Sequence, residues 1–306
     1  MKKILITGAG SFIGTSFENY IKNHPNAADY EISVMDTLSG KKVSCNGAAL
    51  EDDETWNFEG YDAVFHVAGI AHSDVGKVSE EGKELYKKVN TDLAIDTAKK
   101  AKAAGVKQFI FMSSAIVYGA SSPIGKEKII TKDTKPEPEN FYGESKLNAE
   151  IGLNAIADGG SESFKVVILR PPMIYGPGCK GNYNSLRKFA LKLPLFPKVS
   201  NARSMLYIDN LCEFIRLMID NEESGTFHPA NAELSNTSEM VRLIAEAHGK
   251  KIGLVGGFTW LLKILSHFTG LVNKAFGNLT YSDELTEYKE SYRVCALEDS
   301  IKKTER

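Results

Sequence analysis

The chain has 306 residues, of which 42% are hydrophobic and 25% are charged, and its formal net charge is −2. This composition is typical of a soluble globular protein with a large core. The near-neutral charge argues against a surface for nucleic acid or for an anionic membrane. Four cysteines, at positions 45, 179, 212 and 295, lack Cys-x-x-Cys spacing, which predicts neither a disulfide framework nor a zinc site. We therefore expect a cytoplasmic protein without a metal, a signal peptide or a transmembrane segment.

The segment 2–14 predicts a buried parallel strand, a glycine turn and the start of a helix. Its glycines Gly8, Gly10 and Gly14 would let a pyrophosphate approach the amides at the helix start. Their spacing differs from the standard Gly-x-Gly-x-x-Gly, so an ordinary glycine-rich turn is the alternative. A second strand ends at Asp36, about 20 residues later, where dinucleotide-binding folds place an acid for the adenosine ribose. An acid there favours NAD over NADP, although an aspartate that merely starts a turn is the alternative.

Further strands are predicted at 62–69 and 108–112, and the helix predicted from Leu85 to Ala104 between them contains Asn90. Strands thus alternate with helices along the first half of the chain, which predicts an α/β fold, a Rossmann doubly wound parallel sheet. Ligands of such sheets bind beyond the carboxyl ends of the strands. The residues expected to converge there are Gly8, Asp36, Ala68 and Ser114.

The segment 138–146 opens another predicted helix, in which Tyr142 and Lys146 are four residues apart and therefore share a face. A nearby ammonium group would lower the pKa of a phenol, which is about 10 in water. Tyr142 could then accept a proton at neutral pH. A chance pairing of a tyrosine and a lysine on a helix surface is the alternative.

The second half of the chain begins with a buried strand at 164–169 and a rigid loop rich in proline and glycine at 170–178. Most of the chain beyond this loop is predicted to be helical, at 183–193, 209–221, 238–248 and 259–268. We expect a nucleotide-binding domain at 1–170, to which segments around 203–228 return. A smaller, mostly helical substrate lobe is expected at 171–306.

Taken together, these motifs resemble the extended short-chain dehydrogenase/reductase superfamily, and within it the nucleotide-sugar epimerases, dehydratases and reductases. The resemblance covers nearly the whole chain, and bacterial UDP-sugar 4-epimerases and 4-keto-reductases of surface-polysaccharide synthesis are the most similar. It rests on TGAGSFIG at 7–14, Asp36, HVAG at 66–69, Asn90, SSAIVYG at 113–119, YGESK at 142–146 and RPPMIYGPG at 170–178.

The resemblance implies a catalytic group of Ser114, Tyr142 and Lys146. Tyr142 would exchange a proton with the C4 hydroxyl of the sugar, Ser114 would bond the same oxygen, and Lys146 would hold the nicotinamide ribose. The substrate would be bound by His72, Ser114, Asn182, Tyr183 and Arg203, with the arginine on the diphosphate. The implied NAD-binding residues are Gly8, Gly10, Ser11, Phe12, Ile13, Gly14, Asp36, Val67, Ala68, Gly69, Asn90, Met112, Tyr142, Lys146 and Pro171.

Two residues depart from the family pattern. Ser11 replaces the middle glycine of the phosphate loop, where it should still permit binding. Met173 replaces an asparagine that many sugar epimerases place near the diphosphate. The family's 4,6-dehydratases have an Asp-Glu pair directly after the catalytic hydroxyl, where this chain has Ala115 and Ile116, so dehydration is not expected.

Three functions are compatible with these residues. The first is reversible 4-epimerisation of a UDP-hexose with tightly held NAD, as in UDP-glucose 4-epimerases. The second uses the same residues once, in an NAD(P)H-dependent 4-keto-reductase of a UDP-4-keto-6-deoxy-sugar. The third is a non-catalytic protein that senses dinucleotides.

The expected partners are a nucleotide sugar and a second copy of the chain, and no nucleic acid. The superfamily commonly dimerises through two helices, which here would be 85–104 and 142–157. The apolar segment 258–276 has helical spacing. Core or oligomer packing is one interpretation of it, and contact with a membrane surface is the other.

Overall fold

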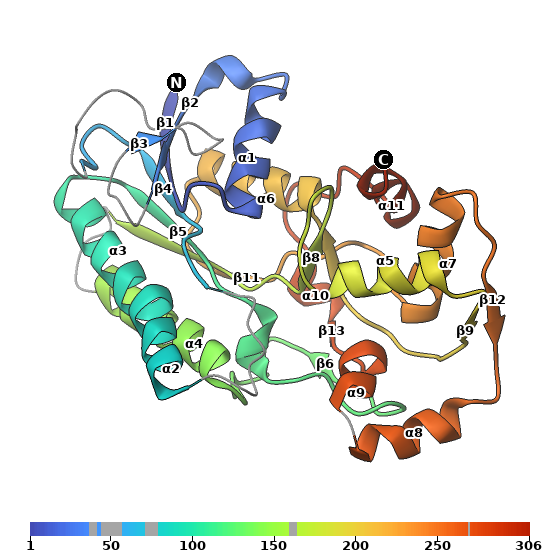
Figure 1. Ribbon diagram of the computed structural model, residues 1–306. Helices are drawn as coiled ribbons and strands as arrows, with labels where there is room; N and C mark the ends of the chain where they lie inside the picture. Colours follow the sequence, from blue (N-terminus) through green and yellow to red (C-terminus); the bar gives the residue numbers. More distant parts are fainter. Residues whose placement is uncertain (37–41, 44–56, 71–78, 159–163, 269) are drawn as a thin grey trace. The chain divides into compact units, whose positions relative to one another are not determined.

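The computed structural model describes residues 1–36, 42–43, 57–70, 79–158, 164–268 and 270–306 (Figure 1). The chain divides into two compact units. The first comprises Met1–Val117, Pro136–Arg170 and Cys212–Phe227, and the second comprises Tyr118–Lys135, Pro171–Leu211 and His228–Arg306. Residues 118–135 therefore cluster with the second unit, although the sequence assigned them to the nucleotide-binding domain.

The first unit is built on a parallel sheet. Among the described residues the sheet has seven strands in the order β11-β7-β5-β4-β1-β2-β3, and only β3 is antiparallel to its neighbour. This arrangement confirms the predicted doubly wound fold. The strands are β1 (Lys2–Thr7), β2 (Tyr30–Met35), β3 (Lys42–Val43), β4 (Ala63–His66), β5 (Gln108–Met112), β7 (Lys165–Leu169) and β11 (Gly225–Phe227).

Helices cover both faces of this sheet, with α2, α3 and α4 on one side and α1 and α6 on the other (Figure 1). Because side chains alternate along a strand, successive residues feed the two layers. Leu5 and Phe109 join a cluster with Ala98 of α3 and Leu153 of α4, whereas Phe65 meets Phe17 of α1 edge to face at 5.3 Å. The helices are α1 (Phe12–Lys22), α2 (Glu80–Tyr86), α3 (Leu93–Ala103), α4 (Phe141–Asp158) and α6 (Ile208–Asp220), the last belonging to this unit from Cys212.

One predicted helix differs in the structure. The helix expected at 85–104 is made of α2 and α3, which are joined by a π-helical turn at Lys87–Asp92. The wider turn contains Asn90, whose side chain is fully buried. Inserted π turns are common at functional sites, and this one aims the Asn90 amide at two neighbouring elements, a loop and a helix.

The second unit contains short parallel strand pairs and several helices. Pairs form between β8 (Met173–Tyr175) and β10 (Met205–Tyr207), between β9 (Leu195–Pro197) and β12 (Gly253–Val255), and between β6 (Ile129–Ile130) and β13 (Thr280–Tyr281). Strands β10 and β13 are buried throughout, whereas β12 has no buried residue. The helices are α5 (Asn182–Lys192), α7 (Thr237–Ala247), α8 (Thr259–Phe268), α9 (Gly270–Phe276), α10 (Asp283–Thr286) and α11 (Leu297–Thr304). In the described part of the chain no helix is long and apolar enough to cross a membrane.

Candidate active site

The turn after β1 requires its glycines for two different reasons. Gly8 has φ +104°, and a Cβ there would lie 2.7 Å from the backbone nitrogen of Ala68. Gly10 has φ +70°, and no atom would lie within 4 Å of its Cβ. Gly8 is thus fixed by the neighbouring backbone, while Gly10 leaves open space beside the turn. Such space at the start of a helix suits the pyrophosphate of a dinucleotide.

Ser11 acts as the N-cap of α1, because its side-chain oxygen accepts a hydrogen bond from the Gly14 amide at 3.1 Å. A Cβ on Gly14 would lie 2.7 Å from this same oxygen. The serine that departs from the family pattern therefore starts the helix instead of disturbing it. Phe12 and Ile13, in the first turn of α1, are both half-buried.

The ends of three neighbouring strands bring the other predicted nucleotide residues to the same edge. Thr7 at the end of β1 pairs with Met35 and with His66. Asp36 directly follows Met35, and Val67, Ala68 and Gly69 follow His66. The acid expected at the adenosine ribose and the expected cofactor-lining loop thus lie on both sides of the glycine turn.

Asn90 fixes the loop after β4. Its side chain accepts from the Ile70 amide at 2.8 Å and donates to the Ile70 carbonyl at 3.1 Å. It also donates to the Ser145 hydroxyl at 3.1 Å, and that hydroxyl donates to the Tyr142 carbonyl at 2.8 Å. The side chain of Asn90 therefore joins the cofactor-lining loop to α4, and the π turn orients it toward both.

Lys146 lies one turn beyond Tyr142 on α4 and is only 5% exposed. Its ammonium donates to the Met112 carbonyl at 2.8 Å and lies 4.7 Å from the centre of the Phe111 ring. A Cβ on Gly69 would be 3.3 Å from the ammonium nitrogen. Burial lowers the pKa of Lys146 to about 8, against the opposing effect of Glu150. A buried lysine with a strongly shifted pKa is typical of a functional site.

Tyr142 is half-buried, and its ring meets Tyr86 edge to face at 6.1 Å. Burial raises the pKa of Tyr142 to about 12, although a side-chain hydrogen bond from Ser114 lowers it. The expectation that Lys146 would lower this pKa toward neutrality is therefore not met by the protein groups alone, because burial dominates. The phenol holds its proton at neutral pH in this structure.

Two charged residues behind Lys146 were not singled out by the sequence analysis. Glu150 is fully buried, accepts a short hydrogen bond from the Ser113 hydroxyl, and pairs with Arg170 through nitrogen–oxygen distances of 3.1 and 3.2 Å. Glu150 lies four residues after Lys146, so helical spacing could have indicated it. This cluster connects the ends of β5 and β7 to α4, which supports the position of Lys146.

His66 is fully buried beside the site, and its Nδ1 lies 2.7 Å from the Thr7 hydroxyl. Burial, helped by the charge on Lys146, lowers the pKa of His66 to about 3. The imidazole is therefore neutral at neutral pH and serves the packing of the strand ends.

The residues predicted to bind the substrate lie mainly in the second unit. Asn182 is exposed at the first position of α5, whereas Tyr183 is 1% exposed and stacks on Tyr175 at 5.4 Å. The Tyr183 ring thus belongs to the core, and its backbone amide is the group left for a ligand. Pro171 is buried at the start of this unit. His72 lies outside the described residues.

Arg203 is held by backbone pairing on both sides of its strand-like segment. It exchanges two hydrogen bonds with Ser235 at 2.9 and 2.8 Å, and the amide of the next residue donates to Leu279. Its guanidinium donates to the Ser121 hydroxyl at 3.2 Å and to the Ala275 carbonyl at 3.4 Å. Burial lowers the pKa of Arg203 from its usual value, so a bound anion would stabilise its charge.

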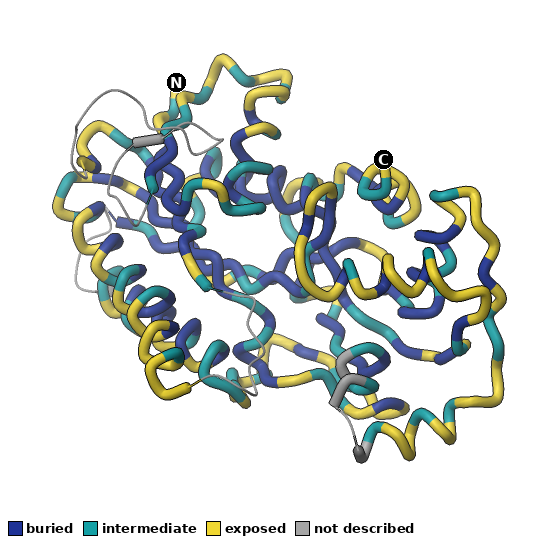
Figure 2. Tube along the Cα trace, viewed as in Figure 1, coloured by how far each residue is buried: buried dark blue, intermediate teal, exposed yellow. Residues whose placement is uncertain are grey.

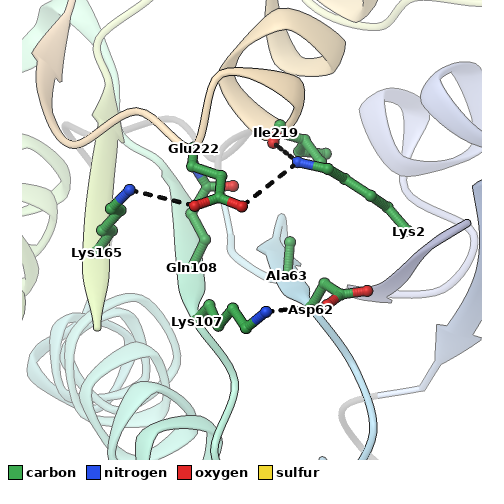
Figure 3. A pocket seen from close by; sticks show the side chains of 8 residues that line it. All are labelled: Lys2, Asp62, Ala63, Lys107, Gln108, Lys165, Ile219 and Glu222. Atoms are coloured by element: carbon green, nitrogen blue, oxygen red, sulfur yellow. Dashed lines mark hydrogen bonds and ion pairs between the residues drawn. The ribbon is translucent and has the colours of Figure 1, made fainter. Parts of the chain in front are cut away.

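A cavity of about 320 Å³ lies at the opposite, amino-terminal edge of the sheet (Figure 3). Its charged groups are paired: Lys2 and Lys165 lie 3.9 and 3.4 Å from Glu222, and Lys107 lies 3.9 Å from Asp62. Parallel sheets bind ligands at the carboxyl edge, so this cavity is not the candidate site. Across the described residues no group of acids, histidines and cysteines could hold a metal ion.

The fold and the carboxyl-edge residues together define a Rossmann-type enzyme that binds a dinucleotide. The sequence matches the NAD dependent epimerase/dehydratase family over residues 4–231, and the chain belongs to this family. The predicted family, enzyme class and cofactor, NAD, are thereby confirmed.

Two curated relatives give the most informative similarities. UDP-glucose 4-epimerase of Vibrio cholerae is 33% identical over 93% of this chain and 85% of that protein. An N-acetyl-alpha-D-glucosaminyl-diphospho-ditrans,octacis-undecaprenol 4-epimerase of Escherichia coli O157:H7 is 28% identical over 87% of this chain and 81% of that protein.

Solved structures share the fold at low sequence identity. UDP-glucuronic acid 4-epimerase from Bacillus cereus, in complex with NAD, has a TM-score of 0.70 at 18% identity and covers 98% of this chain and 96% of its own. A dTDP-4-dehydrorhamnose reductase from Clostridium acetobutylicum has a TM-score of 0.71 at 18% identity, with coverage of 99% and 98%. At this identity the likeness is one of fold.

Proposed function

We propose that the protein is an NAD-dependent 4-epimerase of a UDP-hexose. The observation that carries the proposal is the group of Ser114, Tyr142 and Lys146 at the carboxyl edge of the sheet, where the glycine turn and Asp36 also lie. The 33% identity to a UDP-glucose 4-epimerase over most of both chains supports it. Ala115 and Ile116 follow the catalytic hydroxyl, which supports epimerisation over dehydration.

The residues at this edge fit NAD. The open space beside Gly10 and the amides at the start of α1 suit the pyrophosphate, and Asp36 suits the adenosine ribose. Lys146 would bond the nicotinamide ribose. When bound, NAD supplies a reversible hydride acceptor and a positive charge on its oxidised ring.

Tyr142 is the proposed acid and base. Its phenol takes the proton of the sugar C4 hydroxyl as that carbon is oxidised, and returns a proton to the oxygen when the carbon is reduced from the opposite face. Ser114 donates to the phenol and bonds the same sugar oxygen. Because burial keeps the phenol protonated without cofactor, positive charge near the ring is needed before it can act as a base.

The diphosphate of the substrate is proposed to bind to the second unit. The amides of Asn182 and Tyr183 open α5, and a helix start favours anions. Arg203 would add a bidentate guanidinium. Met173 replaces an asparagine near this group, which leaves the preferred sugar open. His72 remains a proposed substrate contact.

The test is to incubate the purified protein with UDP-sugars and to read the products by NMR without added cofactor. The panel includes UDP-glucose, UDP-N-acetylglucosamine, and a polyprenol-diphosphate-linked N-acetylglucosamine, since one relative is named for that substrate class. Inversion at C4 without added NAD is the expected result. A protein that only consumes added NAD(P)H with a 4-keto-sugar would be a reductase, and the proposal would fail.

A further inference from the structure

An exposed apolar helix stands out in the second unit. Helix α8 leaves Trp260 64% and Ile264 49% exposed, together with Leu261 and Leu265 at 38% and 41%. Phe258, directly before the helix, is 47% exposed. Figure 2 shows this helix among the least buried parts of its unit. Large apolar side chains gathered on one element mark an interaction surface.

The four exposed side chains form one face of α8. At 100° per residue, Trp260, Ile264, Leu261 and Leu265 occupy a continuous arc of the helix. Lys263 lies on the other side of the helix, beside Gly125. A Cβ built on Gly125 would be 3.1 Å from the Lys263 Cε atom. The half-buried residues of α8 are Thr259, Leu262 and Ser266, which lie opposite this arc, so the helix presents the exposed apolar face outward.

The segment after α8 is firmly held. Asn273 of α9 accepts from the Ile124 amide at 3.2 Å, and the Ala275 carbonyl accepts from the Thr237 hydroxyl at 2.7 Å. Phe276 packs against Phe196 at 5.7 Å. The outward face of α8 is thus presented from an anchored base.

The segment of the chain that contains α8 is basic. Residues 249–282 contain four lysines and no acid, and residues 171–208 contain six lysines and arginines and no acid. The two segments pair directly through β12 and β9. Lys188, Lys192, Lys198, Lys250 and Lys251 are all exposed in them. The net charge of −2 therefore conceals two basic segments, in which Arg187 is paired with Glu305 at the C-cap of α11.

We propose that α8, with the lysines of its own segment and of the segment paired with it, forms a surface that binds the face of an anionic phospholipid bilayer. An apolar helix face with Trp and Leu, in a segment that carries basic residues and no acid, is the pattern of helices that lie in a membrane interface. The helix has 10 residues, so its length of about 15 Å is half of a bilayer core and it lies along the surface.

Trp260 provides a direct test. The chain has two tryptophans, so the Trp56→Phe protein reports on Trp260 alone. We expect its emission to shift to shorter wavelength with vesicles of phosphatidylglycerol and phosphatidylethanolamine, and lipids brominated near the headgroup to quench it. Unchanged emission together with no sedimentation with these vesicles would overturn the proposal.

Two sets of variants separate the contribution of the apolar face from that of the positive charge. Trp260→Glu with Ile264→Glu should weaken vesicle binding at least about tenfold, because the apolar contact is lost, while the exposed control Val294→Glu should not. Lys192→Gln with Lys251→Gln should weaken binding to anionic vesicles, unlike Lys302→Gln with Lys303→Gln. Binding to phosphatidylcholine vesicles of equal strength would contradict the charge requirement.

A protein interface is the competing outcome. If Trp260→Glu with Ile264→Glu converts a dimer to a monomer in sedimentation velocity, and vesicles bind neither protein, the surface is an interface between copies and the membrane proposal is wrong. Epimerase activity on soluble UDP-sugars is a separate property. It should remain in all of these variants, so failure of the membrane proposal and failure of the proposed activity are distinguishable.

Discussion

Both edges of the central sheet carry lysines, but the lysines at one edge are partly exposed and paired with acids, and the lysine at the other edge is buried. At the amino-terminal edge, Lys2 and Lys165 share Glu222 near the surface, where water screens their charges. At the carboxyl edge, Lys146 is buried, donates to a backbone carbonyl, and has its pKa lowered to about 8. A cavity lined with charges is therefore not by itself a site. The informative lysine is the one that the fold keeps buried at a cost to stability.

The largest effect on turnover should come from removing the Tyr142 hydroxyl. Tyr142→Phe should reduce turnover by about a thousandfold, because proton transfer by a positioned side chain contributes on this order. NAD content and melting temperature should change little. Tyr61→Phe, at the amino-terminal edge, is the matched control and should keep full turnover. Equal activity of the two variants in a UDP-sugar epimerisation assay would show that Tyr142 does not transfer the proton.

The next effect should come from exchanging lysines at the two edges. Lys146→Met should lose about a hundredfold in turnover, since the proposed contact to the cofactor ribose and the positive charge near the phenol both disappear. Lys107→Met, in the paired cluster, should stay within about twofold of the parent. Steady-state kinetics with measured NAD content would check both variants. Comparable losses of turnover would mean that the two edges do not differ in function.

Two glycine substitutions test the comparison through the free energy of unfolding. Gly8→Ala should cost about 3 kcal/mol of unfolding free energy, because positive φ and a 2.7 Å contact to the Ala68 backbone act together. Gly60→Ala, near the amino-terminal edge, has φ +79° and open space, so only the dihedral cost of about 1 kcal/mol should appear. Urea unfolding measures both, and equal losses would mean that the turn tolerates a side chain.

The pH dependence of stability should identify Lys146. Its pKa falls from 10.5 to about 8 on folding, so between these values the unfolded chain binds more protons and stability rises with pH. From pH 8 to 10 the gain is about 2 kcal/mol. Other groups titrate there too, so the measurement is the difference between the parent and Lys146→Met. A flat difference would contradict the lowered pKa.

Much of the carboxyl edge was predictable because local sequence encodes it. The turn at Gly8, the strand end at Asp36 and the helix that contains Tyr142 and Lys146 follow from short patterns, and the structure puts them at one edge. The π turn around Asn90 was not predicted, because a single wider turn has no residue pattern of its own in one sequence. The support from Glu150 and Arg170 was also missed, since Arg170 reaches it only through tertiary packing.

Helix α8 and its basic segment show a different limit of sequence reasoning. The net charge of the whole chain argued against an anionic partner, yet the acids are absent from two segments that pair only in the fold. The apolar spacing at 258–276 left core or oligomer packing and membrane contact open. The exposed fractions of Trp260 and Ile264 exclude core packing for that face, because it is turned outward.

The central claim is that one carbon of a nucleotide sugar is oxidised and reduced again at the carboxyl edge without net consumption of cofactor. It is tested most directly with a UDP-hexose deuterated at C4, incubated with the purified protein and no added NAD. The proposed activity predicts inversion at C4 with the deuterium retained on that carbon in the product. Loss of the deuterium to water, or turnover that depends on added NAD(P)H, would contradict it.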